Sequence, residues 1–113
     1  LVTNIYICVN MRVVAAKTLR LYWEIEKSAE QPLKAWFAEA EKAEWNTPNF
    51  LKQQYRSASI LTDKRVVFNI HGNKYRLIVD IEYRLKTVFI VWLGTHEEYN
   101  KIDAKNVTYV KAN

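Results

Sequence analysis

The sequence predicts an α+β fold in a single domain, with helices in the first half and an antiparallel sheet in the second. Residues 17–45 place apolar side chains at intervals of three and four, which is helical spacing. Residues 58–93 contain short apolar runs bounded by turn residues. Between two of these runs stands Gly72-Asn73, a dipeptide typical of tight hairpins.

Composition limits the functional classes. The chain has 113 residues, a net charge of +5 and a pI of about 9.4, a balance that favours a polyanionic partner such as nucleic acid. A single cysteine, Cys8, excludes an intrachain disulfide and fits a reducing cytoplasm. No apolar run approaches the roughly 20 residues of a membrane span, and no secretory leader is recognisable. We therefore expect a cytoplasmic protein without membrane contact.

The first ten residues stand apart from the rest. Met11 is a plausible start residue and opens the strand-like run MRVVAA. We interpret residues 1–10 as a vector-derived or read-through extension, or as an extra edge strand, with a native first strand as the alternative. Residues 11–113 then form the single domain.

Two N-terminal helices are predicted, over residues 17–27 and from Pro32 to Trp45. Ser28 and Gln31 have the spacing of a capping box at the start of the second helix. Trp23, Trp36 and Phe37 fall at core spacing. A break at residues 46–48 precedes a short helical segment that contains Lys52.

The hairpin around Gly72-Asn73 determines which side chains share a face. With these two residues as the loop, the facing pairs are His71–Lys74, Asn69–Arg76, Val67–Ile78 and Arg65–Asp80. These eight residues form what we call the Arg76 face, predicted to be polar and mostly basic. The opposite face is apolar and predicts the core; it carries Val66, Phe68, Ile70, Tyr75, Leu77, Val79, Ile81 and Tyr83.

A third strand follows residues 84–86. A two- or four-residue loop puts Phe89, Val91 and Leu93 on the Arg76 face and Val88, Ile90 and Trp92 in the core, whereas a three-residue loop inverts this. Beyond the strand we expect one short C-terminal helix, so the sheet has three to four strands.

The residues that could do chemistry are few. No cluster of His, Cys, Asp or Glu has metal-ligand spacing, no glycine elbow surrounds a serine, and no glycine-rich phosphate loop is present. His96 follows the third strand, Tyr99 lies one helical turn further if Glu97 opens a helix, and Arg76 points from the neighbouring strand. Metal-free cleavage of an RNA phosphodiester needs an acid, a base and a cation. The alternative interpretation is structural: a hydrogen-bonding His96, an Arg76–Asp80 pair and a packed Tyr99.

Four blocks in order resemble HigB-type toxins of the RelE-like mRNA interferase family: QPLKAWFAEAEKAEW, LKQQYRSASIL, RVVFNIHGNKYRLIVDIEY and GTHEEYNKID. The similarity runs from Met11 to Asp103. It implies the RelE-like fold, with N-terminal helices packed on one side of a small antiparallel sheet. It also implies cleavage of mRNA, usually in the A site of the 70S ribosome during translation. The implied partner is a HigA-type helix-turn-helix antitoxin that represses the shared operon, and no cofactor is implied.

The family motifs map onto single positions of this chain. The motif G-T-H-x-E-Y corresponds to Gly94, Thr95, His96, Glu98 and Tyr99, and N-K-Y-R to Asn73, Lys74, Tyr75 and Arg76. The resemblance thus implies Arg76 as phosphate anchor, His96 as acid or base, and Tyr99 as base or stacking partner. The candidates for holding the RNA backbone are Lys52, Asn69, Lys74 and Lys101.

Two further residues qualify this assignment. Asn100 stands where similar toxins often carry an acidic residue, which weakens a carboxylate role there. We interpret His71 as an exposed turn residue without a catalytic role. Two other functions remain open: a non-catalytic RNA- or ribosome-binding module, and an inactive toxin that acts as co-repressor with its antitoxin.

Overall fold

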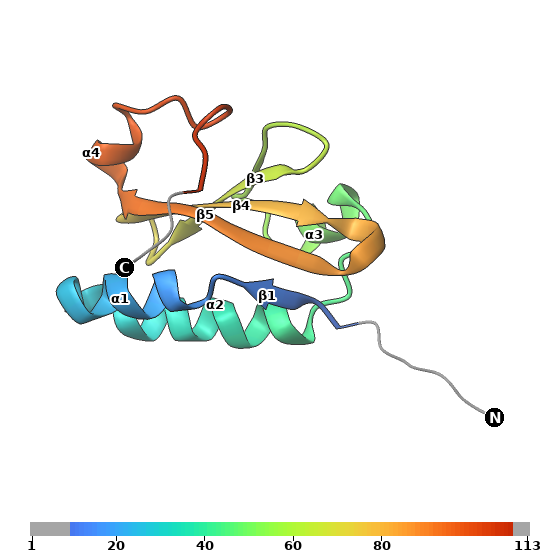
Figure 1. The fold of residues 1–113 in the computed structure, drawn as a ribbon, viewed down its shortest axis with the longest axis horizontal. Helices are drawn as coiled ribbons and strands as arrows, with labels where there is room; N and C mark the ends of the chain where they lie inside the picture. The colour runs from blue at the N-terminus through green and yellow to red at the C-terminus, as the bar shows by residue number, and fades with distance from the viewer. Residues whose placement is uncertain (1–9, 110–113) are drawn as a thin grey trace.

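A computed structural model describes residues 10–109 and shows an α+β fold with a five-stranded sheet (Figure 1). The helices are α1 (Lys17–Ile25), α2 (Glu30–Lys42), α3 (Pro48–Gln54) and α4 (His96–Tyr99). The strands are β1 (Arg12–Val14), β2 (Ser59–Ile60), β3 (Arg65–Ile70), β4 (Tyr75–Glu82) and β5 (Thr87–Thr95), in the order β1-β5-β4-β3-β2. The fold class is confirmed. The predicted extension or edge strand at residues 1–10 lies outside the described residues, apart from Asn10.

The sheet is larger than predicted because two short strands extend its edges. β2 pairs antiparallel with β3, and β1 pairs parallel with β5, so the sheet is mixed. β1 is recognisable in the sequence as a strand, but its partner is not. A parallel partner far along the chain leaves no turn signal between the two strands.

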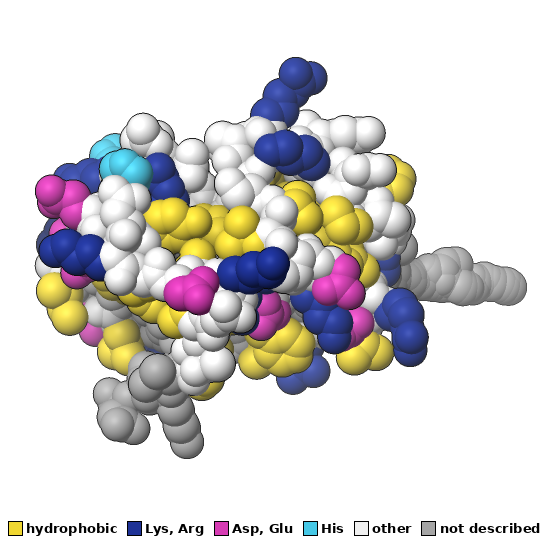
Figure 2. Space-filling view, turned by 90° about the horizontal axis from the view of Figure 1, so that it is seen from above, with side chains coloured by type: hydrophobic (Ala, Val, Ile, Leu, Met, Phe, Trp, Pro, Cys, Tyr) yellow, Lys and Arg dark blue, Asp and Glu magenta, His cyan; other side chains and the backbone are white. Residues whose placement is uncertain are grey.

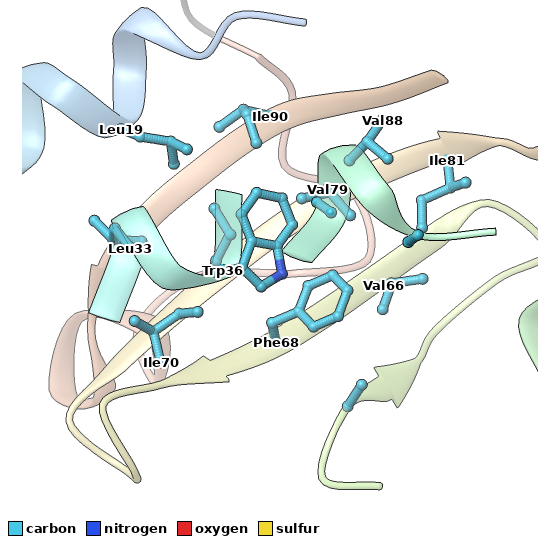
Figure 3. Close-up of a cluster of buried hydrophobic side chains, with 14 of the residues drawn as sticks. Leu19, Leu33, Trp36, Val66, Phe68, Ile70, Val79, Ile81, Val88 and Ile90 are labelled. Atoms are coloured by element: carbon cyan, nitrogen blue, oxygen red, sulfur yellow. The ribbon is translucent and has the colours of Figure 1, made fainter. Parts of the chain in front are cut away.

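The main core lies between the sheet and helices α1 and α2, which cover one face (Figures 1 and 3). Leu33, Trp36 and Ala40 line one side of α2 and are buried, as their spacing predicts. The Trp36 ring meets Phe68 of β3 edge-on, with ring centroids 5.3 Å apart. Trp36 is therefore a core residue, while Trp23 and Phe37 are half-buried at its margin.

The second helix begins differently from the prediction. α2 starts at Glu30 after a short 3-10 helix, η2 (Lys27–Ala29), and no side chain caps it. Ser28 instead hydrogen-bonds the hydroxyl of Tyr75. The predicted capping box at Ser28 and Gln31 is wrong because that serine is engaged by the sheet.

The predicted register of the β3–β4 hairpin is confirmed. Arg65 pairs with Asp80, Val67 with Ile78 and Asn69 with Arg76. The ladder ends at Ile70 and Tyr75, and the positive φ angles fall on His71 (57°) and Gly72 (63°) rather than on Gly72 and Asn73. His71 and Lys74 therefore belong to the turn, and their side chains leave the Arg76 face.

A β-bulge in β5 changes which side chains of its second half point to each face of the sheet. The loop from β4 to β5 has four residues, with Glu82 opposite Thr87, and Val88 and Ile90 lie in the core as predicted. Between Ile90 and Trp92 the register shifts by one residue. An extra residue turns every later side chain over. Trp92 thus lies on the Arg76 face and Leu93 packs against the core, so both predictions are wrong.

The Arg76 face is not the open basic surface that alternation predicts. Val67, Ile78 and Val91 form a second apolar cluster there, covered by Tyr99, Ile102, Ala104 and Val107 of the C-terminal segment. Arg65 holds this segment in place. Its Nη1 donates to the carbonyls of Ala104 (3.1 Å), Lys105 (3.4 Å) and Val107 (2.6 Å), and its Nε and Nη2 bind both oxygens of Asp80 at 2.7 and 2.8 Å.

Replacement of Asp80 by Asn should loosen the C-terminal segment. The nearly buried Arg65 guanidinium would lose its counter-charge, and hydrogen bonding to Asp80 is what raises the pKa of Arg65. We expect the free energy of unfolding in urea to fall by about 1–3 kcal/mol, less than for a fully buried pair because Asp80 is partly exposed. Amide exchange over residues 104–107 should accelerate.

The matched control is Glu82→Gln, which removes the carboxylate of an exposed pair with Lys64 (2.8 Å). That variant should unfold almost as the parent does, because solvent screens exposed pairs. Equal losses in the two variants would contradict a special role for the Arg65–Asp80 pair.

Candidate active site

The site is built around the guanidinium of Arg76, near the start of β4. Arg76 is only 8% exposed. Its Nη1 donates to the carbonyls of Asn73 (3.1 Å) and Tyr75 (3.2 Å), and its Nη2 donates to Asn73 Oδ1 (2.9 Å). Within the described residues, Nε carries no hydrogen bond. The hairpin thus holds Nη1 and one N–H of Nη2. Nε and the second N–H of Nη2 have no partner among the described residues, and two such groups can donate to one anion.

This free edge distinguishes Arg76 from Arg65, the other buried arginine of the same face. Arg65 uses its Nε–Nη2 edge on Asp80 and its Nη1 on carbonyls, so it is committed to structure. The expectation that Arg76 could pair with Asp80 is not met. Asp80 belongs to Arg65, and Arg76 remains without a carboxylate partner in the described residues.

Tyr99 lies over Arg76. The guanidinium carbon is 5.9 Å from the centre of the Tyr99 ring, a cation–π arrangement. The same ring meets that of Trp92, with centroids 6.3 Å apart and a tilt of 54°. The β-bulge places Trp92 there, which sequence alternation missed. Trp92 therefore supports the tyrosine ring, and the tyrosine in turn covers the guanidinium.

A capping box positions α4, which carries His96 and Tyr99. Thr95 Oγ1 accepts from the backbone N–H of Glu98 at 3.1 Å, and Glu98 Oε1 accepts from that of Thr95 at 2.8 Å. The His96 backbone N–H donates to the carbonyl of Lys74 at 2.9 Å, which joins α4 to the hairpin turn. The signal was present in the sequence, since Thr95 and Glu98 have capping-box spacing. The His96 side chain is exposed.

Gly94 allows this helix to lie close to β5. It stands opposite Arg76 in the sheet. A Cβ atom there would lie 2.7 Å from Cζ2 of Trp92 and 2.8 Å from Oε1 of Glu98. Both distances are shorter than side chains tolerate, so glycine is required by the close approach of ring and carboxylate.

The α1–α2 connection meets the same end of the sheet. Lys74 Nζ donates to Ser28 Oγ at 3.0 Å, and Ser28 bonds the Tyr75 hydroxyl, which also donates to Glu26 Oε1 at 3.4 Å. Burial, followed by the charges of Glu98 and Glu26, raises the pKa of the neighbouring Tyr22. The Tyr22 ring of α1 meets that of Tyr75 at 5.8 Å, and the carbonyl of Lys74 accepts from His96 of α4, so α1, the hairpin turn and α4 converge at this end.

The predicted RNA-binding residues are divided between two places. Asn69 is the cross-strand neighbour of Arg76, Lys74 lies in the adjoining turn, and Lys101 is exposed just after α4. Lys52 lies apart on α3, at the other end of the sheet in Figure 1, where its ammonium binds the carbonyls of Arg56 and Ala58. These residues therefore lie at one end of the sheet, although the Lys74 side chain turns toward Ser28, whereas Lys52 lies elsewhere.

Seen from the side opposite α1 and α2, the histidine side chains gather at one end of the molecule beside lysine and arginine (Figure 2). A groove of about 500 Å³ lies elsewhere, between β1, β5 and Tyr109. Among residues 10–109, no three His, Cys, Asp or Glu side chains are grouped as metal ligands. No helix in that range is long and apolar enough to cross a membrane.

Comparison with known proteins gave one informative match. A family model described as HigB toxin, the RelE-like toxic component of a toxin–antitoxin system, matches residues 29–102. This range contains the second helix, the hairpin, Arg76, His96 and Tyr99. A search of curated proteins found no match.

Substitution of Gly94 by Ala should displace α4 from β5. We expect the free energy of unfolding to fall by about 1–3 kcal/mol, as for other insertions into packed sites. Trp92→Phe removes the ring atoms that the new Cβ would meet. The double variant should therefore lose less than the sum of the two single losses, as measured by urea unfolding.

Gly72→Ala provides the control for this cycle. A Cβ at Gly72 would meet nothing within 4 Å, so its effect comes only from the positive φ and should add to that of Trp92→Phe. If the losses from Gly94→Ala and Trp92→Phe were also strictly additive, the new Cβ and the Trp92 ring would not compete for the same space.

Proposed function

Because the chain belongs to the HigB-type family of RelE-like toxic components of toxin–antitoxin systems, we propose that it is an endoribonuclease that cleaves mRNA without a metal ion. The toxin identity and the existence of an antitoxin partner follow from the family. The chemistry, the substrate and the residues that act on it form the proposal.

The single observation that supports it is the free edge of Arg76 beside α4. Two parallel N–H groups match two oxygens of a phosphodiester, and a cation there stabilises the charge that develops on phosphorus. Little water reaches the side chain, because Arg76 is only 8% exposed. A fixed donor in such surroundings acts more strongly than one in bulk solvent.

The reaction is attack of the RNA 2′-hydroxyl on the adjacent phosphorus, which forms a 2′,3′-cyclic phosphate and releases the 5′-oxygen of the next nucleotide. A base accepts the 2′-hydroxyl proton and an acid gives a proton to the leaving oxygen. His96 and Tyr99 stand at the two ends of the single turn of α4, and we assign these two roles to the pair. Which of them is the acid stays open.

The proposed substrate is mRNA on the translating ribosome, in the bacterial cytoplasm. The net charge of +5 supports binding to a polyanion. We assign contacts with flanking phosphates to Asn69, the cross-strand neighbour of Arg76, and to the exposed Lys74 and Lys101. His96, Lys74 and Lys101 are exposed, so we propose that the 70S A site holds the message against them. Neutralisation by a HigA-type helix-turn-helix antitoxin completes the proposal.

One observation favours a second candidate, a non-catalytic ribosome-binding module or an inactive co-repressor. Arg76 is nearly buried and the Tyr99 ring contacts both Trp92 and Arg76, as in a purely structural cluster. In that case substitutions on α4 would leave toxicity or operator repression intact, whereas charge reversal at Lys74 and Arg76 would abolish ribosome binding.

Cell-free translation followed by primer extension on the message tests the proposal. We expect His96→Ala to lower the cleavage rate by about 10²–10⁴-fold, the range for loss of a general acid or base. Tyr99→Phe keeps the ring over Arg76 and removes only the hydroxyl, so a large loss would assign the hydroxyl to chemistry. Arg76→Lys keeps the charge but not the two parallel bonds, and should lose at least about tenfold.

Lys42→Ala serves as the surface control, because this exposed residue lies in the last turn of α2, away from α4. It should cleave as the parent does. Intact protein that leaves the message uncut, or cleavage that survives the combined His96→Ala and Tyr99→Phe changes, would refute the nuclease and leave the binding module.

A further inference from the structure

The tip of the β3–β4 hairpin carries an exposed imidazole in an uncommon backbone conformation. His71 has a φ of 57°, a region that residues other than glycine seldom adopt. Its ring stacks against that of Tyr75, with centroids 6.4 Å apart and planes 27° from parallel. Tyr75 is completely buried, whereas His71 is exposed. One side of the imidazole is thus supported by the core while the side chain remains open to solvent.

The same turn contacts both parts of the candidate site. Asn73 accepts two hydrogen bonds from Arg76, and the carbonyl of Lys74 accepts the backbone N–H of His96. The space around the tip is free, since a Cβ on Gly72 would meet nothing within 4 Å. The same turn thus carries the exposed imidazole and holds the Arg76 guanidinium.

We infer that His71 forms a nucleobase-stacking subsite for the nucleotide next to the phosphate that Arg76 holds. This inference rests on the proposed function. Proteins that bind single-stranded RNA stack its unpaired bases on aromatic side chains, histidine among them, and contact the adjoining phosphates with lysine or arginine. Lys74, exposed on the same turn, supplies that charge. Stacking needs an aromatic ring and no proton transfer. The subsite should therefore affect binding of the RNA, not the rate of the chemical step.

Three variants at position 71 test the subsite. His71→Asn keeps a residue that tolerates positive φ but removes the ring, His71→Gly removes both ring and strain, and His71→Phe keeps a ring that cannot be protonated. Rates are measured against the concentration of ribosome-bound message. We expect Asn and Gly to raise KM by about tenfold with little change in kcat, and Phe to stay close to the parent.

The control is Phe50→Ala, which removes an exposed aromatic ring from α3. It should not change KM. Thermal unfolding of each variant shows whether it is folded. If His71→Asn does not fold, His71→Gly provides the ring-free variant for the test.

Three outcomes separate the possibilities. If the parent cleaves and the ring-free variants match it, the subsite is refuted while the nuclease stands. If His71→Phe loses as much as His71→Asn, the imidazole acts through its charge or proton, which also refutes stacking. If the parent does not cleave at all, the proposed function itself fails.

Discussion

The arrangement of the site depends on one extra residue in β5. The bulge between Ile90 and Trp92 puts Val91 and Trp92 both on the Arg76 face and returns Leu93 to the core. Without it, Trp92 would point toward the helices, and Tyr99 would lose the ring that supports it. The bulge therefore decides whether α4 can close over Arg76.

Two arginines on the Arg76 face have different roles because their neighbours differ. Arg65 and Arg76 are both nearly buried and both come from central strands. Arg65 pairs with Asp80 and donates hydrogen bonds to three carbonyls, and these bonds hold the C-terminal segment on the sheet. Arg76 donates only some of its N–H groups to Asn73. Because its guanidinium is nearly buried and has no carboxylate partner among the described residues, it can bind an anion. Such an unpaired cation is costly in a fold and is retained where it is used.

The sequence predicted the elements whose signals are local. The helices follow from apolar spacing, and the hairpin register follows from Gly72-Asn73 and from alternation, which a one-residue slip would have inverted. Resemblance to a family, rather than spacing, grouped Arg76, His96 and Tyr99. Tyr99 lies over Arg76, and His96 stands at the other end of the same helical turn. Thr95 and Glu98 have capping-box spacing, which is a local signal for the start of α4.

The errors have a common physical cause, which is long-range packing that overrides a local pattern. Alternation cannot reveal a bulge, so Trp92 was assigned to the core. Ser28 has the composition of a cap, but the Tyr75 hydroxyl competes for its oxygen. The lysines and arginines of the Arg76 face suggested an open surface, because nothing in the pattern shows that residues 99–107 cover it.

The parallel pairing of β1 with β5 has a consequence for how the protein acquires its activity. Arg12 pairs with Thr87, so the first strand cannot dock until most of the chain has been synthesised. α4 and the clamped segment are made later still. Contacts between such distant positions form slowly, because the entropic cost of closing a long loop precedes the free energy gained from the contacts. A chain still emerging from its own ribosome therefore lacks a complete site, and the interval before closure is one in which a partner can bind it first.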